Sequence, residues 1–259
     1  MFPNPQDALP LPARPNLDQY KKRAKDLVKA ANSPDPAALN QFVRAWLDSL
    51  LHLTSLTITP QLPVSFDRWT DELSSFLRTE QQSARPFTLA RAQFILARLH
   101  GFESWTKFAR HVQDLARAHS PEATFETAVE AIVSGDLDVL KRLLSSEPSL
   151  VRARSAREHH ATLLHYVAAN GIEGYRQKTP KSIVQIARVL LQAGAEVNAT
   201  AHVYGGEATA LELVATSIHP EQAGLQQELM KLLLDHGASF DAPLVNACLY
   251  SAHACAWET

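Results

Sequence analysis

Histidine is the residue type that most invites a chemical role in this chain, and three histidines gather in its second half. His159, His160 and His165 fall within seven residues. Imidazole nitrogen binds zinc, but a zinc site needs three or four protein ligands in a fixed geometry. No further ligand with suitable spacing lies nearby, so we expect no metal at this place.

Only two cysteines are present, Cys248 and Cys255, both near the end of the sequence. That number argues against a secreted fold held by disulfides. Together with His253 they make a C-x4-H-x-C group, whose spacing matches no familiar zinc pattern. We therefore expect no metal there either.

The sequence carries no catalytic motif of the common kinds. It contains no G-x-S-x-G elbow, no G-x-x-x-x-G-K phosphate loop, no H-E-x-x-H and no G-x-G-x-x-G. The pair Gly205–Gly206 is isolated and is typical of a turn. These observations favour a protein that is not an enzyme and that uses no cofactor.

Charge is spread unevenly along the chain. Residues 16–119 carry 14 Lys and Arg against 10 Asp and Glu, whereas residues 120–259 carry 10 against 16. The run KKRAK (21–25) could contact nucleic acid, but a short basic run is more typical of an exposed helix face. We expect two modules and no nucleic-acid partner.

The ends and the hydropathy of the chain suggest its location. No apolar run approaches the roughly 18 residues of a membrane span. Residues 1–15 contain five prolines and lack the basic start and apolar core of a signal peptide. We expect an extended, unordered tail over 1–15 and a cytoplasmic protein without a membrane partner.

Helical periodicity begins at Asn16 and defines a helical module over 16–119. Asn16, Thr88 and Ser104 each precede an amphipathic segment and are expected to be N-caps. A loop is expected over about 54–65, because it has two prolines and no helical period, and a helix over about 67–77. The large aromatic side chains are expected to anchor the core of this module, and they are Trp46, Trp69 and Trp105.

A repeated pattern marks the second half. Leu-Leu pairs at 143–144, 190–191 and 233–234 each end an amphipathic segment of the same apolar spacing. Two of them continue as LLQAGAEVNA (190–199) and LLDHGASFDA (233–242). The segment TLLHYVAANG (162–171) opens the repeat between the first two pairs.

These segments resemble ankyrin repeats, with LLxxGAxxNA at the end of a unit and TLLHYVAANG near the TPLHxAAxxG opening. The matching tenth positions Gly135, Gly171 and Ile218 lie 36 and 47 residues apart, against about 33 in the family. The resemblance implies an all-α solenoid of three repeats plus a half repeat over 120–259, with short β-turn fingers. The half repeat begins at Ala242.

The residues in excess of the usual repeat length fall in loops of the expected repeats. The turns between units are lengthened at 152–161, the first finger, and at 199–208, the second finger. A further addition, IEGYRQKTPK (172–181, the insert), separates the two helices of the second repeat. Additions at loops leave a stacked core intact and often carry function.

The first half also resembles a known region. The segments 16–30 and 89–112, with AKDL, LARAQ and GF-x-SW, are similar to the region that precedes ankyrin repeats in many bacterial proteins. That likeness implies a bacterial, cytosolic protein. It assigns no activity to the helical module.

The resemblance also bears on the candidate residues. It places His165 at a structural position, where the ring bonds the backbone of a turn. Binding residues are expected among aromatic and polar side chains of the fingers, the insert and the adjoining inner helix, since Tyr and Arg are favoured at interfaces. They are His159, His160, Tyr166, Tyr175, Arg176, His202 and Tyr204.

The function we expect is non-catalytic binding of a protein partner, not identified by the sequence, through the concave surface of fingers and inner helices. We expect a monomer. Two other readings stay open: a ligand-binding or enzymatic cleft at the junction of the module and the repeats, and nucleic-acid binding by the basic N-terminal helix.

Overall fold

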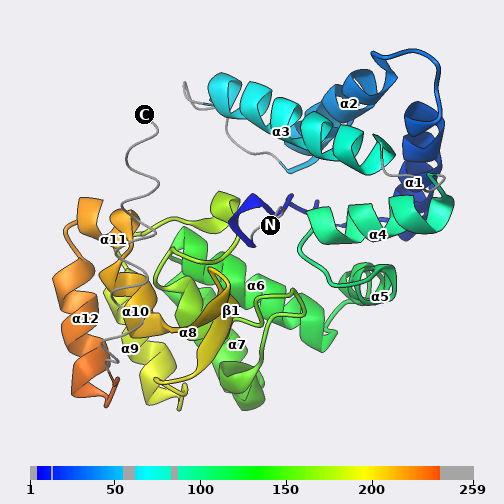
Figure 1. Ribbon diagram of the computed structural model, residues 1–259. Helices are drawn as coiled ribbons and strands as arrows, with labels where there is room; N and C mark the ends of the chain where they lie inside the picture. The colour runs from blue at the N-terminus through cyan, green and yellow to red at the C-terminus, as the bar shows by residue number, and fades with distance from the viewer. Residues whose placement is uncertain (1–4, 13, 55–61, 83–86, 240–259) are drawn as a thin grey trace. The chain divides into compact units, whose positions relative to one another are not determined.

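The structure is a computed structural model that describes residues 5–12, 14–54, 62–82 and 87–239 (Figure 1). The described residues are mostly α-helical and include one two-stranded sheet, which confirms the expected all-α class. No helix in these ranges is both long and apolar enough to cross a lipid bilayer. The expected half repeat from Ala242 and the group Cys248, His253 and Cys255 lie outside them.

The chain divides into two compact units, with the division between Ala116 and Arg117. Residues 9–116 belong to the first unit. The second unit holds the chain from Arg117 onward and also a short N-terminal segment that ends at Ala8. Each unit has a hydrophobic core of its own.

The first unit consists of helices that surround Trp46. Its core is made of leucine, valine and alanine side chains from α1, α2, α3 and α4 around the fully buried Trp46 ring. Trp105 is partly buried and packs on the same core, whereas the side chain of Trp69 is outside the described part. The helices are α1 (Leu17–Ala31), α2 (Ala38–Thr54), α3 (Leu62–Gln82), α4 (Leu89–Leu99) and α5 (Trp105–Leu115).

Local signals predict the ends of several of these helices. The side chains of Asn16, Thr88 and Ser104 accept hydrogen bonds from backbone N–H groups of the first turn, so all three expected N-caps are confirmed. Helix α3 is longer than the expected 67–77 and begins inside the expected loop. Pro63 is tolerated there because a proline in the first helical turn removes no intrahelical hydrogen bond.

The basic run on α1 behaves as an exposed helix face. Lys21, Lys22 and Lys25 are exposed, and the guanidinium of Arg23 lies 5.5 Å from the centre of the Trp46 ring. Arg23 therefore covers the core aromatic, as expected for a snorkelling side chain.

Part of the tail expected over 1–15 is ordered instead. Pro5–Asp7 form a turn of 3-10 helix, η1, within the second unit. In the first unit, Leu9 is buried and its backbone N–H donates to the carbonyl of Leu99 at 2.7 Å.

The second unit is built from antiparallel helix pairs. Helices α6, α8 and α10 contact one another in sequence order, and so do α7, α9 and α12, which gives two layers (Figure 1). The elements are α6 (Pro121–Ser134), α7 (Leu137–Ser146), η2 (Pro148–Arg152), α8 (Leu163–Tyr166), η3 (Gly174–Arg176), α9 (Ile183–Gln192), β1 (Thr200–Val203), β2 (Gly206–Thr209), α10 (Ala210–Ala215), α11 (Ile218–Gln222) and α12 (Gln226–Asp235).

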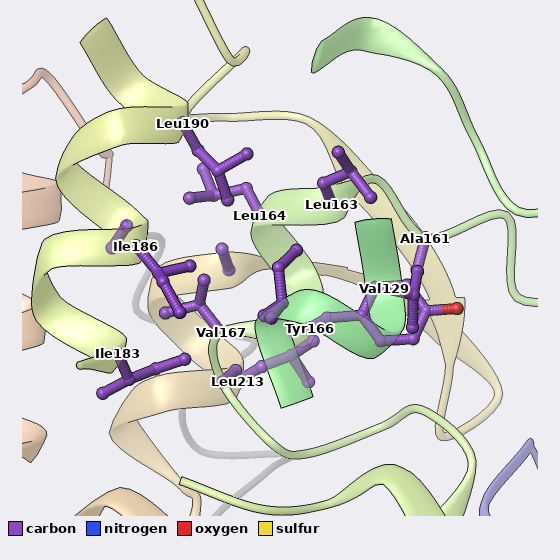
Figure 2. Close-up of a cluster of buried hydrophobic side chains, with 14 of the residues drawn as sticks. Val129, Ala161, Leu163, Leu164, Tyr166, Val167, Ile183, Ile186, Leu190 and Leu213 are labelled. Atoms are coloured by element: carbon purple, nitrogen blue, oxygen red, sulfur yellow. The ribbon is translucent and has the colours of Figure 1, made fainter. Parts of the chain in front are cut away.

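The core of the second unit lies between these layers (Figure 2). Val129 of α6, Leu164 of α8, Ile186 of α9 and Leu213 of α10 belong to one buried cluster. Helix α8 ends early at Tyr166, since Ala169 adopts a left-handed conformation with φ 49°, which the α-helix does not allow.

Candidate functional site

The second finger is a β-hairpin whose tip is aromatic. Strand β1 pairs antiparallel with β2, with Val203 opposite Gly206. The two loop residues Tyr204 and Gly205 both have positive φ, 55° and 78°, as in the type I′ turns that suit hairpins. Tyrosine is uncommon at such a position, and this one is 46% exposed.

The Tyr204 hydroxyl is held by two partners within the second unit. It donates a hydrogen bond to Oδ1 of Asn170, and it accepts one at 2.5 Å from Nε2 of Gln6 in the N-terminal segment. Asn170 is itself fixed, because its amide donates to the carbonyl of Leu213 at 3.1 Å. The tip is therefore exposed and firmly positioned.

The first finger lies along the hairpin and is bonded to it. The backbone N–H of His202 donates to the carbonyl of His159 at 2.8 Å. The guanidinium of Arg154 donates to the carbonyl of His160 at 2.9 Å and to that of Thr200 at 2.7 Å. The two fingers thus form one continuous edge.

This finger edge carries three of the expected binding residues at its surface. The side chain of His202 is 60% exposed, with Nδ1 lying 2.5 Å from a carboxylate oxygen of Glu207. The half-buried ring of His160 meets the His202 ring edge-on at 5.6 Å. With Tyr204 at the tip, the edge offers aromatic rings and both signs of charge.

The other expected binding residues are placed differently. His159, Tyr166 and Arg176 are buried, and Tyr175 is half-buried. His159 is expected to be a binding residue of the first finger, but its side chain is 2% exposed and is not available at the surface. Its ring turns inward, where Nδ1 accepts a hydrogen bond from the backbone N–H of Ala161 at 3.0 Å.

Four charged side chains explain that burial. Glu173 and Arg176 of the insert and Arg157 of the first finger are buried and form a cluster with the half-buried Glu126 of α6, which we call the ion-pair cluster. Glu173 pairs with Arg157 and, at 3.3 Å, with Arg176, which also pairs with Glu126. The insert is thereby fastened to both the first finger and α6.

Tyrosine rings and His159 complete the surroundings of the ion-pair cluster. The guanidinium of Arg176 lies 6.0 Å from the ring centre of Tyr166 and 5.4 Å from that of Tyr175. Nε2 of His159 lies 3.5 Å from Glu173. The hydroxyl of Tyr166 is buried without a hydrogen-bond partner among the described residues.

The electrostatics of the ion-pair cluster keep Glu173 ionised. Burial alone would raise the pKa of this carboxyl, but the guanidinium groups of Arg157 and Arg176 outweigh burial and hold the pKa well below its usual range. Burial raises the pKa of Tyr166 well above its usual value, reinforced by the nearby Glu173 charge. Near neutral pH, Glu173 is a weak base and Tyr166 a neutral phenol.

The residues that organise this region give little signal in the sequence. Arg157, Glu173 and Glu126 did not stand out, since charged side chains are mostly exposed. The available signal was the spacing of Glu173 and Arg176, three residues apart in an inserted loop. Gln6 and Asn170 carried no signal, because their bonds to Tyr204 span 198 and 34 residues.

The structural role expected for His165 is confirmed. Its Nδ1 accepts from the backbone N–H of Thr162 at 3.1 Å, and its Nε2 lies 3.3 Å from the carbonyl of Ala208. Burial lowers the pKa of His165 to about 4, so the ring is neutral near neutral pH. Among the described residues, no group of three or more His, Cys, Asp and Glu is arranged to hold a metal ion.

Comparison with known proteins adds no relative. No protein-family model, no curated protein and no solved structure matches this chain.

Proposed function

We propose that residues 120–259 form an ankyrin-type repeat array that binds a protein partner through its fingers and inner helices, without catalysis. The observation that carries this proposal is Tyr204, an exposed aromatic side chain held rigidly at a hairpin tip. The helix pairs α6–α7, α8–α9 and α10–α12 and the hairpin that precedes α10 support the repeat assignment. We also propose that the protein is cytoplasmic and bacterial.

The backbone at Tyr204 is unusual enough to favour a role in binding. A non-glycine residue in the left-handed region costs on the order of 1 kcal/mol, and such strain concentrates at functional sites. Asparagine or glycine would fit the turn at lower cost. The tyrosine at this position has a large, rigid, amphipathic side chain, which is the kind that dominates interface energetics.

The ion-pair cluster favours binding in a different way. It anchors the first finger to the insert and to α6 through buried contacts. A loop that is already ordered loses less conformational entropy when a partner binds. Buried members of the expected binding set, such as Arg176, are therefore proposed to position the finger edge, while His160, His202 and Tyr204 contact the partner.

The test is capture of partners from the cells that express the protein. The variant combines His202→Ala with Tyr204→Asn, which removes both rings and leaves an Asn-Gly turn of the favoured type I′. Leu234→Gln is the matched control, because Leu234 is 49% exposed on α12, outside the finger edge. We expect a specific partner to be retained by the wild type and the control and lost by the double variant. Equal retention by all three would contradict the proposal.

A further inference from the structure

A short piece of the chain already contacts the insert and the tip of the finger edge. The N-terminal segment through Ala8 belongs to the second unit, and its turn η1 contacts η3 of the insert (Figure 1). Gln6 reaches the hydroxyl of Tyr204 at 2.5 Å, across 198 residues of sequence. Tyr204, the residue central to the proposed function, is therefore already hydrogen-bonded to a segment of the same chain.

Gly174 shows how closely this occupant fits. A Cβ built on Gly174 would lie 2.8 Å from the backbone carbonyl oxygen of Gln6, a distance that real side chains do not tolerate. The φ of Gly174 is not in the left-handed region, so the backbone itself does not require glycine. What requires glycine here is the close approach of another backbone.

We propose that η3 and Tyr204 form a receptor for a peptide turn that carries a glutamine side chain, and that the chain's own segment 5–8 occupies it in cis. The partner chemistry is thereby defined: a backbone carbonyl against Gly174 and a side-chain amide that donates to the Tyr204 hydroxyl. A partner that presents the same turn displaces segment 5–8. This inference rests on the proposed function and names the partner's recognition element.

Because segment 5–8 belongs to the same chain as the receptor, it competes with any peptide that binds there. A tethered segment competes at an effective concentration on the order of millimolar. Loss of one hydrogen bond of ordinary strength weakens that competition roughly two- to tenfold. Gln6→Ala should therefore open the receptor to a peptide added in trans, without a change to the receptor itself.

The experiment follows backbone amides of the full-length protein by NMR. Labelling with 15N-glycine gives signals from only nine glycines, including Gly174 in the receptor, Gly205 at the hairpin tip and Gly194, which follows the end of α9 outside the receptor. The probe is a synthetic peptide, acetyl-PNPQDAL-amide, which has the sequence of residues 3–9. It is titrated to several millimolar into the wild type and into Gln6→Ala.

We expect the peptide to shift the Gly174 and Gly205 signals of Gln6→Ala at a concentration at least twofold lower than in the wild type, while Gly194 stays still. The variant Gln6→Ala/Gly174→Ala should lose the response at Gly205. Its matched control, Gln6→Ala/Gly206→Ala, should keep it, because a Cβ at Gly206 meets nothing within 4 Å.

Three results would overturn the inference: no peptide response in Gln6→Ala, the same response in the wild type and Gln6→Ala, or a response that survives Gly174→Ala. A wild-type dimer that Gln6→Ala dissociates would assign the segment to a second copy and overturn the cis arrangement. None of these results alters the capture experiment with His202 and Tyr204, so failure of the receptor and failure of the proposed function are distinguishable.

Discussion

Arg157 shows how one buried residue organises a surface. Its side chain is 1% exposed and pairs with a fully buried Glu173, and its guanidinium also donates to the hydroxyl of Tyr175 at 3.3 Å. A buried ion pair adds little net stability compared with apolar side chains of equal volume, but removal of one partner is costly. The pair therefore matters mainly because it fixes one arrangement of the first finger and the insert.

Replacement of Arg157 alone should destabilise the second unit strongly. Arg157→Ala leaves the Glu173 carboxylate buried with weaker compensation, and we expect a loss of about 3–5 kcal/mol in the free energy of unfolding. Urea unfolding followed by far-UV circular dichroism measures it. Arg152→Ala is the control, because Arg152 is exposed in the same finger and should cost less than about 0.5 kcal/mol.

A charge-balanced variant separates burial from pairing. Arg157→Met with Glu173→Gln removes one charge of each sign and leaves Arg176 paired with Glu126. It should recover most of the stability lost in Arg157→Ala. A double variant as unstable as the single one would show that the ion pair itself provides the stability.

His165 gives the second unit a defined dependence on pH. An exposed histidine has a pKa near 6.5, whereas burial holds the pKa of folded His165 to about 4. As the pH falls from 6.5 to 4, the unfolded chain binds a proton that the folded chain excludes. The stability should therefore decrease over this range, by about 3 kcal/mol in total for this residue.

The variant His165→Asn tests that contribution. Asparagine can still accept a hydrogen bond from the Thr162 N–H but does not titrate. The free energy of unfolding of the variant should therefore fall less between pH 6.5 and pH 4 than that of the wild type. Hydrogen exchange of amides in α8 and α9 at several pH values measures the difference. Identical pH dependence in the two proteins would refute the assignment of this pKa to His165.

The residues that could be predicted from sequence are those with local partners. The bond between His165 and Thr162 spans three residues, and the cap at Thr88 bonds the N–H of Arg91. The burial of His159 and Arg176 could not be predicted, because it depends on partners far away in sequence. Glu126 is 50 residues from Arg176, and no local pattern encodes that distance.

At the scale of elements, a single glycine, Gly135, allows the insert to approach α6 closely. Gly135 caps α6 with φ 84°, and a Cβ there would lie 2.7 Å from side-chain atoms of Pro180 and Ser182. The Ser182 hydroxyl donates to the Gly135 carbonyl at 2.8 Å. The end of the insert is therefore seated directly on the end of α6.

Alanine at Gly135 should cost more than alanine at Gly194. Both glycines have positive φ and follow the end of a helix, so both variants carry a backbone penalty of about 1 kcal/mol. A Cβ at Gly194 meets nothing within 4 Å, whereas Gly135→Ala adds a clash of about 1–3 kcal/mol. Thermal unfolding of the two variants measures the difference, and equal destabilisation would mean that the insert does not press on α6.

Elements with strong periodicity are predictable, and elements set by tertiary contacts are less so. The amphipathic segments that became α4, α5 and α9 follow the sequence pattern closely. Helix α3 exceeds its expected range at both ends and contacts α2, and tertiary packing contributes helix stability that a local pattern does not report. Helix α8 ends at Tyr166, shortly before the left-handed Ala169, a conformation that alanine does not signal in advance.

At the scale of the molecule, a small N-terminal segment takes part in a unit that begins more than a hundred residues later. The charge asymmetry and the change from helical module to repeated pattern point to two modules, and the chain forms two compact units. Sequence could not assign segment 5–8 to the second of them. Its contacts with η3 and Tyr204 are non-local and leave no periodic trace.

The most direct test of the central claim, recognition of a protein partner by the finger edge, is site-specific photo-cross-linking in living cells. The photoreactive residue p-benzoylphenylalanine replaces His202 in one strain and Leu234 in another, since both side chains are exposed. We predict a discrete cross-linked product at position 202, absent at position 234 and lost when Tyr204→Asn is added. A product that forms equally at both positions, or none at position 202, would contradict the account.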